Sequence, residues 1–101
     1  MLTFNLKKEW FDKIKSGEKT HEYREIKPYW VKRLDYIKST LDRKLINGHF
    51  CYFVSGYPKR SEVDKYMGAI IKSISIINGK NTDLAIDKDV YDIEFELITE
   101  V

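Results

Sequence analysis

The segment Lys19–Glu25, with the sequence KTHEYRE, holds the residues of this chain best suited to bind a ligand. Arg24 offers a planar fork of donors that fits a phosphate, a carboxylate or the edge of a base, and Lys19 adds a point charge nearby. Glu22 could accept a hydrogen bond from an exocyclic amine, or simply hold Arg24 in position. Together these side chains suit a polar, partly anionic ligand such as a nucleotide.

The sequence around this segment predicts that it is extended. It follows a helix stop at Gly17 and precedes Pro28, a residue typical of the first turn of a helix. In a strand, Thr20, Glu22 and Arg24 share one face, and the other four residues point the opposite way. Two interpretations stay open: a charged edge strand that discourages pairing with other sheets, or a functional face.

Aromatic and basic residues further along the chain are additional candidates. Trp30 lies in the first turn of the next helix and is expected in the core, whereas Tyr29 or Tyr57 could stack on a base. Residues 27–44 carry six Lys and Arg against two Asp. A solvated helix face explains this excess as well as a phosphate track does.

Cysteine and histidine offer little evidence for catalysis. Cys51 lies in an apolar run, so we expect a buried thiol and not a nucleophile paired with His49 or His21. His21 is expected to pack at a rim, not to act as a general base. Two histidines and one cysteine show none of the usual ligand spacings, so neither a metal nor another cofactor is predicted. A single cysteine allows no intramolecular disulfide, which agrees with a cytoplasmic setting.

Hydrophobic periodicity predicts the elements that must position these residues. The expected order is a strand at 2–6, a helix ending before Gly17, the extended segment, one long or two short helices from Pro28 to Asn47, and strands at 50–54, 67–77 and 91–97. The strand at 50–54 is expected to be buried on both faces. Alternation slips at Lys72-Ser73, which predicts a bulge, and a brief strand is expected at 84–86. Asn78-Gly79 indicates a turn.

Length and composition indicate one globular domain spanning residues 1–101. The chain is 43% hydrophobic and 34% charged, which excludes a largely disordered protein, and no apolar run approaches the ~20 residues needed to cross a bilayer. Residues 1–8 are not expected to be a signal peptide, because their lysines follow a very short apolar stretch. Early helices and late strands predict an α+β fold, with enough strands to close a small β-barrel.

The net charge of +2 hides an uneven distribution. Residues 1–80 hold 17 Lys and Arg against 9 Asp and Glu, while residues 81–101 hold one Lys against 7 Asp and Glu. This distribution indicates either a basic face that binds an anionic ligand, or a fold in which the basic residues 1–80 and the acidic residues 81–101 neutralise each other. The acidic part is expected to be mostly the solvent-facing side of the last strand.

Residues 16–24, SGEKTHEYR, resemble the Gly-x-Lys-x-x-Glu-x-Arg signature of ASCH domains, which are PUA-like β-barrels associated with RNA and modified nucleosides. Residues 23–30 and 53–59, YREIKPYW and FVSGYPK, resemble segments of small stand-alone bacterial and phage members. The resemblance implies a PUA-like barrel of five or six strands with two or three flanking helices. It also implies a cleft lined by Lys19, Glu22 and Arg24, with Ser55, Gly56 and Tyr57 as the opposite wall and Lys59 and Arg60 at its rim.

One ASCH-like subgroup hydrolyses acetylcytidine with a Lys, a hydroxyl nucleophile three residues later and a distal catalytic Glu. Here Lys19 matches the Lys, but Glu22 occupies the nucleophile position and cannot form the same ester intermediate. Glu62 is the candidate for the distal carboxylate in the loop after residue 55. A catalytic pair of Lys19 and Glu22, with Glu22 activating water, is therefore expected only if the protein is an enzyme.

The sequence thus predicts a cytoplasmic RNA- or modified-nucleotide-binding domain whose partner is single-stranded or modified RNA, or a nucleotide, and not a membrane. A hydrolase acting on an acylated nucleoside or on RNA is the enzyme alternative. A regulator that binds an acidic protein through its basic face is the third hypothesis.

Overall fold

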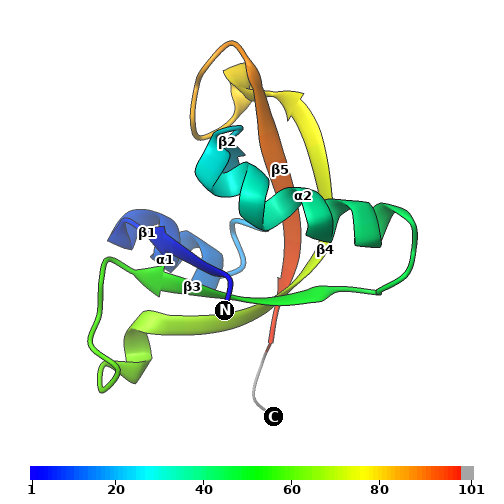
Figure 1. Cartoon of the computed structure of the whole chain (residues 1–101). Helices are drawn as coiled ribbons and strands as arrows, with labels where there is room; N and C mark the ends of the chain where they lie inside the picture. The colour runs from blue at the N-terminus through cyan, green and yellow to red at the C-terminus, as the bar shows by residue number, and fades with distance from the viewer. Residues whose placement is uncertain (99–101) are drawn as a thin grey trace.

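A computed structural model describes residues 1–98, so residues 99–101 of the expected domain lie outside the described part. The chain forms a five-stranded mixed sheet curled into a half-barrel, with two α-helices, as Figure 1 shows. The predicted α+β class with a five-stranded barrel-like sheet is confirmed. The elements are β1 (Thr3–Leu6), α1 (Lys8–Lys15), β2 (His21–Glu25), α2 (Pro28–Asp42), β3 (His49–Ser55), η1 (Val63–Lys65), β4 (Tyr66–Asn78), η2 (Gly79–Asn81) and β5 (Asp89–Leu97).

The strand order β1-β3-β4-β5-β2 places β1 and β2 at the two edges of the sheet. β1 runs parallel to β3, whereas the other neighbouring strands pair antiparallel. The two edge strands each have one side without a strand partner. The half-barrel is therefore open between β1 and β2.

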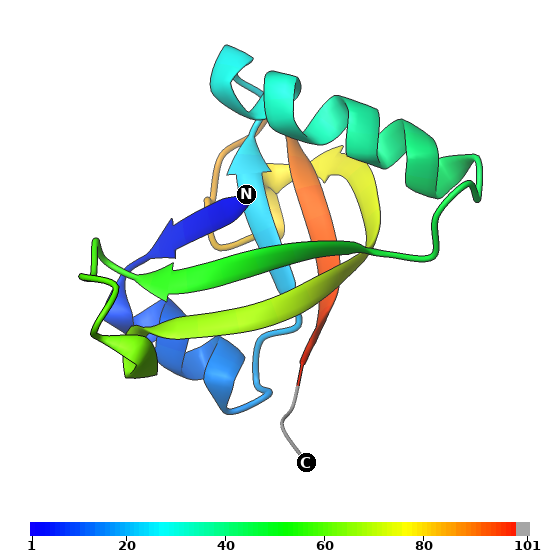
Figure 2. The same ribbon diagram turned by 60° about the horizontal axis from the view of Figure 1, so that its bottom comes forward.

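The two helices lie at opposite ends of the curled sheet, α2 near the top and α1 near the bottom of Figure 2. α1 buries Phe11 and Ile14, and Gly17 follows its last turn with a φ of 84°, the left-handed conformation expected of a C′ glycine. α2 starts at Pro28 and is one helix, which settles the choice between one long helix and two short ones. No helix within residues 1–98 is both long and apolar enough to cross a membrane.

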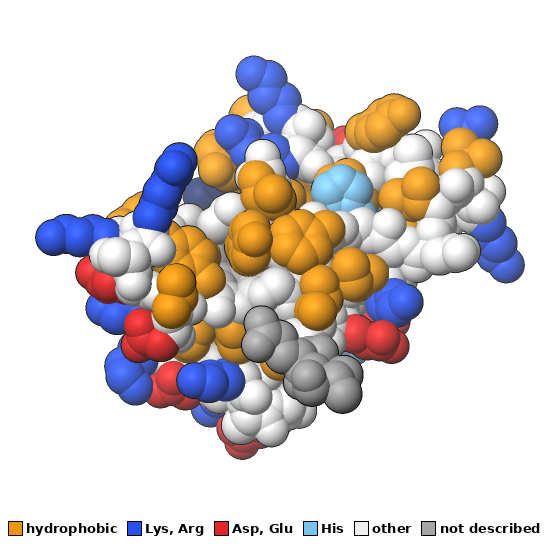
Figure 3. Space-filling model, turned by 90° about the horizontal axis from the view of Figure 1, so that it is seen from below, with side chains coloured by type: hydrophobic (Ala, Val, Ile, Leu, Met, Phe, Trp, Pro, Cys, Tyr) orange, Lys and Arg blue, Asp and Glu red, His pale blue; other side chains and the backbone are white. Residues whose placement is uncertain are grey.

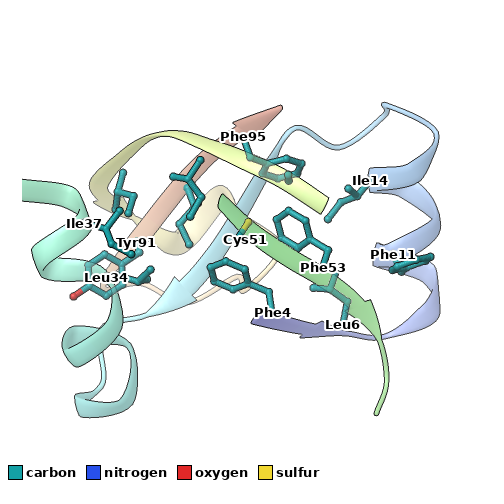
Figure 4. Packing of buried hydrophobic residues seen from close by; sticks show 14 residues of the cluster. Phe4, Leu6, Phe11, Ile14, Leu34, Ile37, Cys51, Phe53, Tyr91 and Phe95 are labelled. Atoms are coloured by element: carbon teal, nitrogen blue, oxygen red, sulfur yellow. The ribbon is translucent and has the colours of Figure 1, made fainter. Parts of the chain in front are cut away.

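The core lies inside the curled sheet, between α1 and α2, as Figure 4 shows. Phe53 stands at its centre, with ring centroids 5.3 Å from Phe4 and 4.5 Å from Phe95. Cys51 is fully buried beside these rings, as predicted. The packed rings and aliphatic side chains fix β1 against β3, and so fix one wall of the opening between β1 and β2.

The predicted bulge is present, because the register of β4 with β5 shifts between Ile71 and Ser73. Such a bulge bends a strand and increases its twist, which helps a five-stranded sheet to curl. The predicted brief strand at 84–86 is wrong. These residues belong to the loop before β5, where Ala85 takes a φ of 49° and the backbone N–H of Ile86 bonds back to the carbonyl of Gly79.

The prediction that β3 is buried on both faces holds fully only for the inner face. Phe50 and Tyr52 lie on the outer face and are half-buried, packing edge-on at 4.9 Å. Tyr66 of β4 continues this row, 6.3 Å from Tyr52. Figure 3 shows hydrophobic side chains gathered over this outer face of β3 and β4. No helix among residues 1–98 covers this face, which is why these aromatic residues keep part of their surface exposed.

Candidate ligand-binding pocket

A pocket of about 330 Å³ opens between the two edge strands of the half-barrel. Its walls come from the end of β1, from β2, from the first turns of α1 and α2, and from the loop before β5. The lining residues are Asn5, Leu6, Lys7, Trp10, Glu22, Tyr23, Arg24, Glu25, Lys27, Trp30, Asp83 and Leu84.

Lys19, Glu22 and Arg24 form one cluster: Glu22 and Arg24 line this pocket, and Lys19 lies beside it and lines an adjoining hollow. One Glu22 oxygen accepts from Arg24 Nη2 at 2.6 Å and from Arg24 Nε at 3.0 Å. The other Glu22 oxygen lies 3.2 Å from the ammonium of Lys19. Lys19 precedes the start of β2 at His21, so strand alternation does not direct its side chain away from Glu22. Glu22 therefore joins the two cations into one cluster.

This cluster is largely withdrawn from water. The Glu22 and Lys19 side chains are 8% and 9% exposed, and the Arg24 side chain is 18% exposed. Buried charges are tolerated when they are paired and hydrogen-bonded, and that condition holds here. Arg24 Nη2 also donates to the backbone carbonyl of Asn5 at 3.2 Å. This bond links β2 to β1 across the opening of the half-barrel.

Aromatic rings hold the two cations in place. The Arg24 guanidinium carbon lies 4.9 Å from the ring centre of Trp30 and 5.2 Å from that of Phe4. The Lys19 ammonium lies 5.6 Å from the ring centre of Trp10. Trp30 stacks on Phe4 at 5.1 Å, so it packs against the core as predicted and also lines the pocket. Cation–π contacts of this kind orient a charged group and reduce its freedom to move.

Asp83 completes the cluster from the loop before β5. Its carboxylate forms an ion pair with the ammonium of Lys19, and its side chain is 32% exposed. A second hollow of about 300 Å³ adjoins the first and shares Trp10, Tyr23 and Asp83 with it, and Lys19 lines this hollow. The Lys19–Asp83 pair therefore lies where the two hollows meet.

The predicted opposite wall lies elsewhere in part. Ser55 lines a separate hollow with α1 residues and Lys65. The carbonyl of Gly56 accepts a hydrogen bond of 2.7 Å from the side chain of Asn5, whose residue also lines the main pocket. Tyr57 is 91% exposed, and Lys59 and Arg60 are exposed beyond it in the same loop. The structure thus brings together Lys19, Glu22 and Arg24 but not these loop residues.

Glu62, the candidate for the distal carboxylate, does not line the pocket. Glu62, the residue before η1, pairs with Lys65 at 2.8 Å, and this pairing lowers the pKa of the Glu62 carboxyl. Asp83 is the carboxylate that contacts Lys19. Its loop returns to the pocket only because β4 and β5 pair along their length, so local sequence gave no signal for it.

The pocket rim carries Lys7, Lys27 and Glu25, and Lys88 lies beside Glu25. Lys88 and Lys27 bond to Glu25 at 3.0 and 3.3 Å and lower the pKa of its carboxyl, with Lys88 the larger cause. Burial, and then the nearby charge of Asp92, raise the pKa of the Tyr23 hydroxyl, so Tyr23 stays protonated at neutral pH. Lys7 adds a further exposed cation at the rim.

Histidine and cysteine behave as the sequence indicates. His21 Nδ1 lies 2.6 Å from Asp92 on the neighbouring strand, and its ring stacks near Tyr23 at the edge of the sheet. Burial raises the pKa of the Cys51 thiol to about 12. A fully protonated thiol at neutral pH is a poor nucleophile, so Cys51 is a core residue.

The sequence analysis did not predict several residues that line the pocket, among them Asn5, Trp10, Trp30 and Asp83. Asn5 and Trp10 lie on elements whose hydrophobic periodicity predicts packing against a core and gives no sign of a ligand. The same periodicity predicts Trp30 as a core residue. A cationic segment between two tryptophan-bearing helices was the one available signal, since cations and indole rings often pair.

No protein-family model matches this chain, and no curated protein matches it. The functional interpretation therefore depends on the fold and on the geometry of the pocket.

Proposed function

We propose that this chain is an ASCH-type, PUA-like domain that binds RNA or a modified nucleotide in the pocket between β1 and β2. The observation that carries the proposal is the buried cluster of Lys19, Glu22 and Arg24 set between Trp10 and Trp30. Polar groups in fixed positions beside aromatic rings suit a nucleobase, which needs both stacking and hydrogen bonding.

Arg24 has donors available for such a ligand. Its Nε and Nη2 atoms are engaged by Glu22 and Asn5, whereas its Nη1 atom makes no hydrogen bond within residues 1–98. A base carbonyl or ring nitrogen could accept from Nη1 without disturbing the cluster. Trp10 and Trp30 both line the pocket, and a base that stacks on an aromatic ring gains about 1–3 kcal/mol.

The rim supports a role in RNA binding. Lys7 and Lys27 border the pocket and would meet the phosphates of a strand whose base enters it. We propose Lys59 and Arg60, with Tyr57 and the adjoining Ser55 and Gly56, as a more distant contact for the same strand. Their loop begins where Gly56 bonds to Asn5, and so it starts at the pocket wall.

A labelled single-stranded RNA of random sequence, titrated at two salt concentrations, tests the proposal. We expect Arg24→Ala and Lys19→Ala to weaken binding at least about fivefold, while the salt dependence contributed by rim phosphates stays similar. Arg43→Ala, at the exposed end of α2, is the matched control and should bind like the wild type. Circular dichroism checks that each variant is folded. Unchanged affinity in both pocket variants would contradict the proposal.

A hydrolase is the second candidate, and one observation favours it. Lys19 lies between the carboxylates of Glu22 and Asp83, a Lys–carboxylate arrangement able to move a proton. Both oxygens of Glu22 already accept from cations, so a role in activating water requires one partner to move. Incubation with acetylcytidine and with RNA, followed by chromatography, separates catalysis from binding alone. Product that persists with Glu22→Gln would remove Glu22 from the mechanism.

A further inference from the structure

We infer that the inner wall of the pocket accepts an uncharged planar group and repels an anion, and that Asp83 is the residue that sets this preference. The inference rests on the proposed function in taking the pocket as the ligand site. It adds that the ligand enters with its base first, and that phosphates stay at the rim.

The inner wall consists of Glu22, Arg24 and Asp83, with Lys19 directly beside it in the adjoining hollow. Together these four side chains are neutral because their charges are paired within the protein. Lys19 and Arg24 contribute two positive charges, and Glu22 and Asp83 contribute two negative charges. Glu22 contacts both cations, at 3.2 and 2.6 Å, and Asp83 contacts Lys19 directly. An entering phosphate or carboxylate would have to displace one of these carboxylates or lie beside it. Both outcomes are unfavourable where water is largely excluded.

The surroundings of the two cations are partly aromatic. The Arg24 guanidinium carbon lies 5.2 Å from the ring centre of Phe4 and 4.9 Å from that of Trp30. The Lys19 ammonium lies 5.0 Å from the ring centre of Tyr23 and 5.6 Å from that of Trp10. Aromatic rings therefore border both cations, and Arg24 Nη1 is the guanidinium nitrogen without a hydrogen bond within residues 1–98. An uncharged base can still stack on an indole ring and accept from Arg24 Nη1.

Asp83 is the carboxylate whose charge can be removed with less disturbance to the cluster than that of Glu22. Glu22 belongs to β2 and is paired with both cations, whereas Asp83 belongs to a loop and pairs with Lys19 alone. Asp83→Asn leaves Lys19 and Arg24 to share the single carboxylate of Glu22. The four side chains of the cluster then carry a net charge of +1, and an anion can approach Lys19.

The two tryptophans of the chain provide a direct probe, because both line the pocket. Acrylamide and iodide are small quenchers of indole fluorescence, and they differ in charge. The ratio of the iodide to the acrylamide quenching constant, at constant ionic strength, reports how the pocket treats an anion relative to a neutral molecule. The measurement needs no RNA or nucleotide, so its failure and the failure of the proposed function are distinguishable.

For Asp83→Asn we expect this ratio to rise about threefold to fourfold, the effect of one unit charge at about 5–6 Å in a water-like dielectric. Asp42→Asn makes the same charge change at the end of α2, where Asp42 pairs with Lys38, and should leave the ratio at its wild-type value. An unchanged ratio in a folded Asp83→Asn variant would overturn the inference.

If Asp83→Asn does not fold, a variant that removes a positive charge from the cluster tests the inference instead. Lys19→Met gives the cluster a net charge of −1, so the ratio should fall by a similar factor. The double variant Lys19→Met with Asp83→Asn restores neutrality and should return the ratio to the wild-type value. A double variant that matches either single variant would contradict control by net charge.

Discussion

Glu22 holds the pocket together at the scale of single residues. Its carboxylate accepts from Arg24 with one oxygen and pairs with Lys19 through the other, while Arg24 reaches across to the backbone of Asn5. Lys19, Glu22 and Arg24 come from one seven-residue segment, and their charges already indicated a common site, although strand alternation placed Lys19 on the opposite face. The fourth member, Asp83, comes from a loop whose position depends on long-range strand pairing.

Substitution Glu22→Gln should therefore destabilise the fold as well as the pocket. The buried amide cannot neutralise two cations, and leaving a buried polar partner unsatisfied costs about 1–3 kcal/mol. Urea denaturation followed by circular dichroism measures the loss in the free energy of unfolding. Glu9→Gln, on the exposed first turn of α1, makes the same change in charge and should cost far less. Equal stability of Glu22→Gln and the wild type would show that the cluster does not support the fold.

Cys51 should be inert in the folded protein. Burial raises its pKa from an ordinary value of 9.0 to about 12, so its reactive thiolate is scarce at pH 8. We expect iodoacetamide to label Cys51 at least about a hundredfold more slowly in buffer than in a denaturing concentration of urea. Mass spectrometry of timed samples measures both rates. Rapid labelling of the folded chain would restore Cys51 as a candidate nucleophile.

At the scale of elements, α2 is fixed to the sheet by packing and by one polar contact. Leu34 and Ile37 are buried against the core, and the hydroxyl of the buried Tyr91 donates to Asp35 on the exposed side of the helix. Burial, and then this bond to Asp35, raise the pKa of Tyr91 above its ordinary value of 10.0. The contact orients the helix whose first turn carries Trp30.

Tyr91→Phe removes this contact and should cost about 1 kcal/mol at neutral pH, since Asp35 can return to water. The pH dependence follows from the raised pKa. Unfolded Tyr91 ionises near pH 10 while the folded residue keeps its proton, so its stabilisation is present below pH 10 and declines above it. The free energy of unfolding should fall more steeply above pH 10 for the wild type than for Tyr91→Phe. Tyr36→Phe, on the exposed side of α2, should behave like the wild type.

The turn between α1 and β2 depends on Gly17. Its φ is 84°, and an added Cβ would meet no atom within 4 Å, so Gly17→Ala has a conformational cost alone. We expect a loss of about 1–2 kcal/mol in the free energy of unfolding, measured by urea denaturation. Glu18→Ala, at the adjacent exposed position, should have little effect. A stable Gly17→Ala variant would mean that the turn can adopt another conformation.

Most elements could be predicted because their patterns are local. The bulge at Lys72-Ser73 shows as a slip in alternation, and the single helix after Pro28 follows its apolar spacing. Residues 84–86 were misassigned because a short apolar run has the same pattern in a strand and in a packed loop. The order of strands in the sheet, which creates the opening between β1 and β2, has no local signature.

At the scale of the whole molecule, the uneven charge along the chain is partly neutralised in space. Asp83 from the acidic part pairs with Lys19, Asp92 and Glu94 flank His21, and Lys88 pairs with Glu25. Of the two interpretations left open by the sequence, mutual neutralisation therefore describes the inner pocket. The excess of cations remains on the rim and the helix surfaces.

We propose above that a base of single-stranded RNA enters the pocket between β1 and β2. Tryptophan fluorescence during titration with a random single-stranded RNA octamer tests it most directly, because Trp10 and Trp30 both line that pocket. We predict a saturable change in fluorescence that follows the binding curve measured by anisotropy, and that Arg24→Ala weakens both. RNA that binds with unchanged tryptophan fluorescence, or equally well to Arg24→Ala, would contradict the claim.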